Sequence, residues 1–202
     1  MFWGFKPDHI LAEYAELVPK GRVLDLGAGE GRNALFFAKK GHVVEGVDIS
    51  KKALEKCIKW AKKANLKIKT KVCDLTKMKI DTGKYSIIIC AWVLNFFKKK
   101  DIENIIRKMK KGIKKNGFVY ISVFSLIDPS YKRSKKKYCK IAKNTFYNQE
   151  KEYYMHYFTK KELLSFFKNF TPIYCVEGTE LDITHSKPHY HGLIIYMGKK
   201  GK

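Results

Sequence analysis

Short apolar segments alternate along the first 124 residues with segments in which apolar residues recur every three or four positions. Short apolar runs, typical of buried strands, occupy 22–26, 42–48, 67–73, 85–90 and 118–124. Helical spacing of apolar residues covers 31–40, 50–63 and 101–114. This alternation predicts an α/β fold in which helices cover a doubly wound, mostly parallel sheet.

The remainder of the chain predicts one more helix and two more strands. Thr159 and Glu162 form a capping box that would begin a helix over 159–169. Strands follow at 172–177 and 193–197, and because the connection into them is too short for a crossover helix, we expect an antiparallel hairpin. That hairpin would complete a seven-stranded sheet.

Residues 126–152 are irregular and lysine-rich, and they directly follow the fifth predicted strand. In doubly wound folds, the loops at the carboxyl ends of the strands line the ligand crevice. We interpret this stretch as a basic insertion near the substrate site, with a solvated surface loop as the alternative.

Length and composition favour one domain over 1–202, with an N-terminal helix or lid over 1–20. The net charge is +23, yet residues 1–50 hold only six basic residues against seven acidic ones. Only four of the 42 basic residues are arginine, so the excess carries little of the chemistry that reads nucleic-acid bases. Five scattered cysteines without a C-x-x-C pair, and no apolar run of 18 residues, predict a reduced cytoplasmic protein without a membrane helix.

The sharpest motif is VLDLGAGEG at 23–31, in which Gly27, Gly29 and Gly31 stand between a predicted strand and a predicted helix. It differs from the dinucleotide pattern G-x-G-x-x-G, since Arg32 occupies the place of the third glycine. Asp25 and Glu30 make the loop acidic, which repels phosphate. The loop therefore suits a cationic ligand, such as an amino acid with a sulfonium centre.

Two further acids end the next two predicted strands. Asp48 lies 23 residues after Asp25, close to the separation at which an acid reaches ribose hydroxyls. Asp74 could accept a hydrogen bond from an adenine amine, with the ring held between Ile49 and Leu75. The alternative for both acids is helix N-capping.

The chain resembles the class I S-adenosylmethionine-dependent methyltransferases in the motifs VLDLGAGEG, VVEGVDIS, VCDL and KYSIIICAWVL, followed by KKNGFVYISVF. The stretch from Gly31 to Gly41, GRNALFFAKKG, is most similar to the small tellurite-resistance type. The resemblance implies a Rossmann-like fold with strand order 3-2-1-4-5-7-6. It also implies S-adenosylmethionine as cofactor and S-adenosylhomocysteine as product.

The resemblance implies roles for particular residues. Those that would hold the methionine part or shape its loop are Asp25, Gly27, Ala28, Gly29, Gly31, Arg32 and Asn33. Those that would hold the nucleoside are Asp48, Ile49, Asp74 and Leu75. Cys90 and Ala91 would lie beside the sulfonium through their backbone groups.

Methyl transfer depends on positioning an in-line nucleophile, so no catalytic residue needs to stand out. After 85–90 the chain reads AWVLN, without the D/N-P-P-Y type motif of amino-methylating enzymes, and no cysteine adjoins a proline. We predict a small-molecule acceptor, a thiol or another soft or anionic group. The alternatives are an RNA or protein methyltransferase and a non-catalytic S-adenosylmethionine-binding protein, with nucleic acid possible but not favoured.

His185, His189 and His191 form a cluster near Asp182. His189 and His191 would share one face if the last strand begins there. The cluster is interpreted as binding the acceptor or acting as its base, with a polar hairpin tip or a zinc or soft-metal site as alternatives. We predict no resident metal.

Aromatic and polar residues outside the cofactor motifs are candidates for the acceptor pocket. The N-terminal aromatic run could fold over the cofactor, and Trp92 and Phe97 follow the fourth predicted strand. The predicted substrate residues are Trp3, Asn95, Phe96, Tyr131 and Arg133. The sequence is compatible with a monomer or a homodimer.

Overall fold

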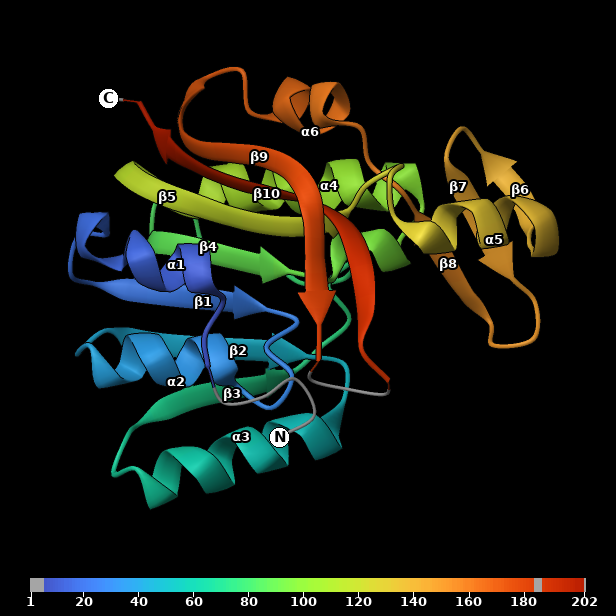
Figure 1. The fold of residues 1–202 in the computed structure, drawn as a ribbon. Coiled ribbons are helices and arrows are strands. Elements are labelled where there is room, and N and C mark those ends of the chain that lie inside the picture. The colour runs from blue at the N-terminus through green and yellow to red at the C-terminus, as the bar shows by residue number, and fades with distance from the viewer. Residues whose placement is uncertain (1–5, 184–186, 202) are drawn as a thin grey trace.

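A seven-stranded sheet forms the centre of the protein, of which the computed structural model describes residues 6–183 and 187–201 (Figure 1). Its order is β3-β2-β1-β4-β5-β10-β9, with β9 and β10 antiparallel. Counted within this sheet alone, that is the predicted order 3-2-1-4-5-7-6. The bounds are β1 (Arg22–Leu26), β2 (Val43–Asp48), β3 (Ile68–Val72), β4 (Tyr85–Ala91), β5 (Ile113–Phe124), β9 (Phe170–Asp182) and β10 (His189–Lys200).

Helices cover both faces of this sheet, as the alternating pattern predicted. Along β4, Ile88 packs in the core with α4 and α6, whereas Ile87 and Ile89 pack in the core with α1 and α2. Because β4 is buried on both faces, its sequence is a continuous apolar run. The helices are α1 (His9–Glu13), η1 (Ala15–Leu17), α2 (Arg32–Lys39), α3 (Lys51–Lys63), η2 (Leu94–Phe96), α4 (Lys99–Gly112) and α6 (Lys160–Phe166). None of the described helices is long and apolar enough to span a bilayer.

The insertion is not irregular, which corrects the prediction for 126–152. It contains helix α5 (Pro129–Lys137), β6 (Cys139–Ala142) and β7 (Thr145–Asn148). The folded insertion continues past residue 152 into β8 (Tyr153–His156), which completes a separate antiparallel sheet. The insertion projects beyond the end of β4, at the right of Figure 1. Phe146, Met155 and Tyr157 give it a small core of its own. The insertion is therefore a folded element beside the carboxyl end of β4.

The C-terminal hairpin is longer than the apolar pattern predicted. β10 pairs with β9 from His189 to Lys200, but it pairs with β5 only from Leu193 to Lys199. The segment 189–192 thus extends past β5, where it crosses the start of α5. A side chain at Gly192 would collide with the backbone of Asp128, so glycine is needed for this close approach.

Candidate functional site

A cavity of about 590 Å³ opens at the carboxyl ends of β1, β2 and β4. This edge of the sheet is where open α/β folds bind their ligands. The cavity is lined by Asp25, Gly27, Ala28, Gly29, Glu30, Arg32, Asn33, Asp48, Ile49, Cys73, Asp74, Leu75, Thr76, Ala91, Trp92, Val93, Phe96, Phe97, Lys98, Asp101 and Tyr154.

The glycine loop forms one wall of this cavity. The amides of Gly27 and Ala28 donate to the carbonyl of Val47, at 2.7 and 3.0 Å, which fastens the loop to β2. Gly29 has a φ of +55°, and none of the residues that the structure describes lies within 4 Å of the position its Cβ would take. The loop therefore presents bare backbone to the cavity, which allows a ligand to approach closely.

Close packing between two helices explains why residue 31 is a glycine, which the sequence did not reveal. Its φ is +91°, and a Cβ there would lie 2.3 Å from Sγ of Cys57 on α3. Gly31 is the N-cap of α2 and is not among the residues that line the cavity. The glycine therefore lets α2 begin close against α3.

Asp25 and Arg32 are ionisable side chains at the base of the loop, Asp25 buried and Arg32 partly buried. Burial raises the pKa of Asp25 to about 7, with Asp48 acting in the same direction, while Arg32 and the Ala34 amide oppose the shift. Both residues line the cavity. A cationic ligand group would favour the ionised form of Asp25.

Asn33 ties the chain before α1 to the loop. Its Oδ1 accepts a hydrogen bond from the amide of Asp8 at 3.0 Å, and Asp8 also lies 4.0 Å from Arg32. Arg32 and Asn33 therefore shape the loop by holding the segment that precedes α1, while both also line the cavity.

Asp48 and Asp74 stand at the ends of β2 and β3 and line the same cavity. The two oxygens of Asp48 accept from different amides, Gly29 at 2.8 Å and Ser50 at 2.8 Å. Ser50 itself is the N-cap of α3, so Asp48 is not the helix cap that the alternative reading proposed. The hydroxyl and amide of Thr76 bond Oδ1 of Asp74 and lower the pKa of this carboxyl, which keeps it an acceptor.

Two apolar side chains, Ile49 and Leu75, line the cavity beside Asp48 and Asp74. Ile49 is 74% exposed, an unusual state for a large apolar side chain beside a cavity, and Leu75 is buried. That the two hold a ring between them stays a prediction. An exposed apolar surface in a concave site marks a place where a ligand can bury it.

An aromatic wall follows β4. Trp92 has a φ of +63°, a left-handed conformation that a bulky residue adopts only where its surroundings hold it, and its amide donates to the carbonyl of Ser122 at 2.8 Å. Trp92, Phe96 and Phe97 line the cavity together with Ala91. The side chain of Cys90 is fully buried and is not part of the lining.

The insertion contributes to the cavity through Tyr154 on β8, a residue that the sequence analysis missed. The Lys98 ammonium lies 4.8 Å from the centre of the Tyr154 ring, and both residues line the cavity. Tyr154 stands in a stretch rich in aromatic residues, YYMHYF, whose sequence does not show which ring faces a ligand.

The predicted substrate residues do not all line the cavity. Phe96 lines the cavity, and Trp3 lies outside the described residues. Tyr131 and Arg133 are not part of the lining: the Tyr131 ring packs on Phe146 and Tyr157 within the insertion, and Arg133 is exposed on α5.

Asn95 is fully buried and has a structural role. Its Oδ1 accepts from the Phe124 amide at 3.1 Å, and its Nδ2 donates to the His156 carbonyl at 2.6 Å. The amide of this side chain is thus occupied in joining η2, β5 and β8, and it does not line the cavity.

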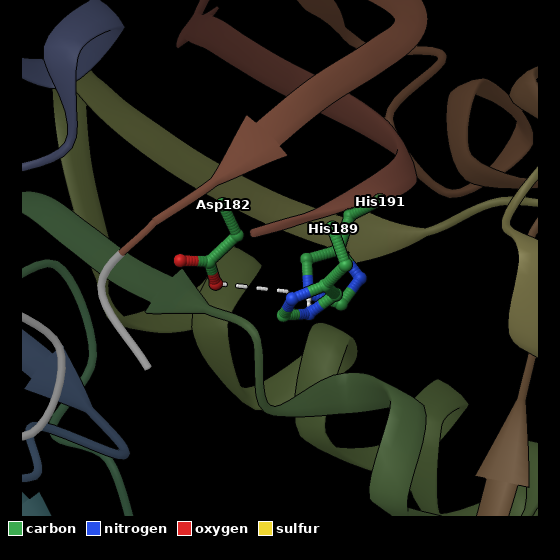
Figure 2. A group of neighbouring side chains, drawn as sticks. All are labelled: Asp182, His189 and His191. Carbon is green, nitrogen blue, oxygen red and sulfur yellow. Dashed lines mark hydrogen bonds and ion pairs between the residues drawn. The ribbon is translucent and has the colours of Figure 1, made fainter. Parts of the chain in front are cut away.

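His189 and His191 share one face at the start of β10, which begins where the prediction required (Figure 2). His191 lies beside Trp92, with ring centres 6.2 Å apart, but neither histidine is part of the cavity lining. Their contact with an acceptor stays a prediction, and His185 lies outside the described residues.

Asp128 lies next to His191. Although burial raises the pKa of Asp128, hydrogen bonds from His191, Ser130 and the Gly192 amide outweigh this effect and hold that pKa below its usual value.

Comparison with known families gives this geometry a context. The family described as "Tellurite resistance protein TehB" matches residues 8–174, which is most of the chain. The chain belongs to the TehB family. The family resemblance carried by the glycine loop and the GRN stretch is therefore confirmed.

Relatives of this TehB-family chain are named as methyltransferases. The probable S-adenosyl-L-methionine-dependent methyltransferase TehB of Haemophilus influenzae is 28% identical over 108 residues, which are 54% of this chain and 37% of that protein. The ubiquinone biosynthesis O-methyltransferase of Pelagibacter ubique is 33% identical over 110 residues, or 54% of this chain and 45% of that protein. The TehB-family chain thus spans less than half the length of these two curated relatives.

A solved structure shows that the fold extends over almost the whole TehB-family chain. A SAM-dependent methyltransferase from Methanosarcina mazei superimposes with a TM-score of 0.77 at 20% identity, covering 97% of this chain and 99% of that one. The predicted Rossmann-like methyltransferase fold is therefore confirmed.

Proposed function

We propose that this protein is an S-adenosylmethionine-dependent methyltransferase that acts on a small-molecule acceptor, a thiol or another soft or anionic group. The observation that carries the proposal is one cavity with two kinds of lining. The glycine loop, Asp48 and Asp74 line it together with an aromatic wall that includes Trp92.

Asp48, Asp74 and Ile49 fit the nucleoside of the cofactor. Asp48 would accept hydrogen bonds from the ribose hydroxyls, since each carboxylate oxygen can accept more than the one amide bond that it has here. Oδ2 of Asp74 is left to accept from the adenine amine, because Thr76 uses Oδ1. Ile49 would cover one side of the ring and bury its exposed surface.

The glycine loop fits the methionine part of the cofactor. The open backbone at Gly29 admits the chain of the amino acid, and Asp25 would face its ammonium group. When bound, S-adenosylmethionine supplies an electrophilic methyl group on a sulfonium. Trp92, Phe96 and Phe97 would surround that cation with aromatic rings, which favour positive charge near their faces.

The aromatic wall also supports a small acceptor. Tyr153 of the insertion contacts Phe96 with ring centres 6.0 Å apart, and its neighbour Tyr154 lines the cavity, so the insertion borders the aromatic wall. Lys98 places a positive charge there, which would attract an anionic acceptor such as a thiolate. A thiolate needs no general base, so positioning within this wall would supply most of the rate acceleration.

Replacing Asp48 by alanine tests the cofactor assignment. Two charge-assisted hydrogen bonds to ribose are each worth about 1.5–3 kcal/mol, so calorimetry should show S-adenosylhomocysteine affinity at least about 100-fold lower. Asp81→Ala is the matched control, because Asp81 is exposed, pairs with Lys84 and lies outside the cavity. Equal affinity of D48A and D81A would refute the assignment.

Turnover separates the proposal from its alternatives. Formation of S-adenosylhomocysteine from S-adenosylmethionine should require a small thiol or related acceptor in a panel that also contains RNA and protein. Turnover only with RNA or protein would replace the small-molecule acceptor. Tight cofactor binding without turnover on any acceptor would instead support a binding protein without catalysis.

A further inference from the structure

Three side chains that could bind one ion converge at the free end of the β9–β10 hairpin (Figure 2). Asp182 ends β9 and stands opposite His189, the first residue of β10, and His191 follows two residues later on the same face. One possible ligand atom from each residue lies within 4.8 Å of the other two. The pairing of the two strands therefore assembles the group.

Hydrogen bonds fix which nitrogen of His191 carries the proton. Its Nδ1 lies 3.1 Å from Oδ2 of Asp128, and the same oxygen accepts a hydrogen bond from the Gly192 amide at 2.9 Å. Because a carboxylate oxygen accepts, Nδ1 of His191 donates. In the neutral ring, Nε2 of His191 then carries a lone pair.

The same reasoning applies to His189. Its Nδ1 lies 2.9 Å from the carbonyl oxygen of Lys187, which can only accept, so Nδ1 donates and Nε2 carries a lone pair. The two Nε2 atoms are 3.0 Å apart. Oδ2 of Asp182 lies 3.7 Å from Nε2 of His191. Three electron-pair donors therefore face one another, and a metal cation between them could engage all three.

We propose that Asp182, His189 and His191 bind a divalent transition-metal ion, with Zn²⁺ as the best match. Tetrahedral zinc with bonds of about 2.0–2.1 Å holds its ligand atoms about 3.3 Å apart, and the separations of 3.0 and 3.7 Å lie on either side of that value. Three protein ligands leave a fourth position for water or another small ligand. From the sequence, a zinc or soft-metal site at this cluster was only an alternative interpretation, and no resident metal was predicted.

Asp128 completes the arrangement as a positioning residue. Zinc-binding histidines generally donate their second ring N–H to a carboxylate or a carbonyl, which orients the ring and raises its basicity. Asp128 does this for His191, and the carbonyl of Lys187 does it for His189. A proton shared by the two histidines is the competing occupant, and it would join only their two rings, whereas a metal ion would engage all three side chains.

Titration of the metal-free full chain with Zn²⁺ and Co²⁺, without cofactor, tests the site. We expect one equivalent of Zn²⁺ to bind in competition with a chromophoric chelator, and His189→Ala and His191→Ala each to weaken binding at least 100-fold. His9→Ala is the control, since His9 is also an exposed histidine near a carboxylate, Glu180. Absent Zn²⁺ binding, or equal binding by H189A and H9A, would overturn the proposal in favour of a shared proton.

Two further variants separate the roles. Asp128→Asn should lower Zn²⁺ affinity about 10- to 100-fold and shift the visible absorption of bound Co²⁺, as loss of an orienting carboxylate does. An unchanged spectrum and affinity would overturn the role given to Asp128. D48A should bind Zn²⁺ as the wild type does, so that failure of the metal site and failure of the cofactor assignment give different results.

Discussion

The surroundings of Asp25 make the stability of the fold depend on pH. Burial, reinforced by Asp48, raises its pKa to about 7, and Arg32 and the Ala34 amide only partly oppose this. The folded chain therefore retains a proton that the unfolded chain releases near pH 4. Its contribution to stability is present at acid pH and is lost as the pH rises towards 7.

Replacing Asp25 by asparagine should remove this dependence. Between pH 4.5 and 7.5, the free energy of unfolding of D25N should rise relative to the wild type by about 2–4 kcal/mol, because asparagine does not titrate. Urea unfolding at several pH values, without cofactor, measures the difference. Parallel curves for the two proteins would show that Asp25 ionises normally in the folded chain.

At the scale of elements, Asn95 joins the insertion to the main sheet. Its side chain bonds the backbone of Phe124 on β5 and of His156 on β8, both in the interior. Asn95→Ala would leave a buried amide and a buried carbonyl without these partners, at about 1–3 kcal/mol each. We expect a loss of about 2–4 kcal/mol in the free energy of unfolding, measured by urea denaturation.

The same variant should expose the insertion selectively. Limited proteolysis should cut N95A within 126–156 before the rest of the chain unfolds, because β8 loses its attachment. Asn169→Ala is the control, since Asn169 is exposed after α6. Equal stability and equal cleavage of the two variants would contradict the role given to Asn95.

The sequence was most informative where residues are buried or lie on the glycine loop. β1 and β4 are apolar because both of their faces are covered, and Gly27 and Gly29 stand where the loop meets the cavity. Asp48 and Asp74 could be placed because parallel strands end at one edge of the sheet. Most of the cofactor wall therefore follows from the order of strands and acids.

The features that were missed have weaker sequence signals. β6 is exposed on all four residues, and the end of β9 is exposed too, so neither has a buried face to produce an alternating pattern. Asn144 makes the turn between β6 and β7 with a φ of +57°, but without the glycine that usually reveals a hairpin. Tyr154 faces the cavity because β8 docks on η2, a contact made only in the folded chain.

At the scale of the whole molecule, the basic residues that produce the net charge of +23 lie mostly outside the cavity. The cavity lining includes five acids but only Arg32 and Lys98 as cations. In contrast, Lys135, Lys136 and Lys137 are exposed on the last turn of α5, and none of them lines the cavity. Much of the positive charge is thus carried by solvent-facing helices and serves no direct contact with the proposed cofactor.

Reversing the three lysines of α5 separates surface charge from catalysis. The variant K135E/K136E/K137E should bind RNA more weakly, and the slope of log affinity against log salt should fall by about one to three. Its affinity for S-adenosylhomocysteine and its turnover of a small acceptor should stay as in the wild type, because this surface lies outside the cavity. If turnover falls in proportion to RNA affinity, the acceptor is delivered by the basic surface, and a macromolecular substrate replaces the small molecule.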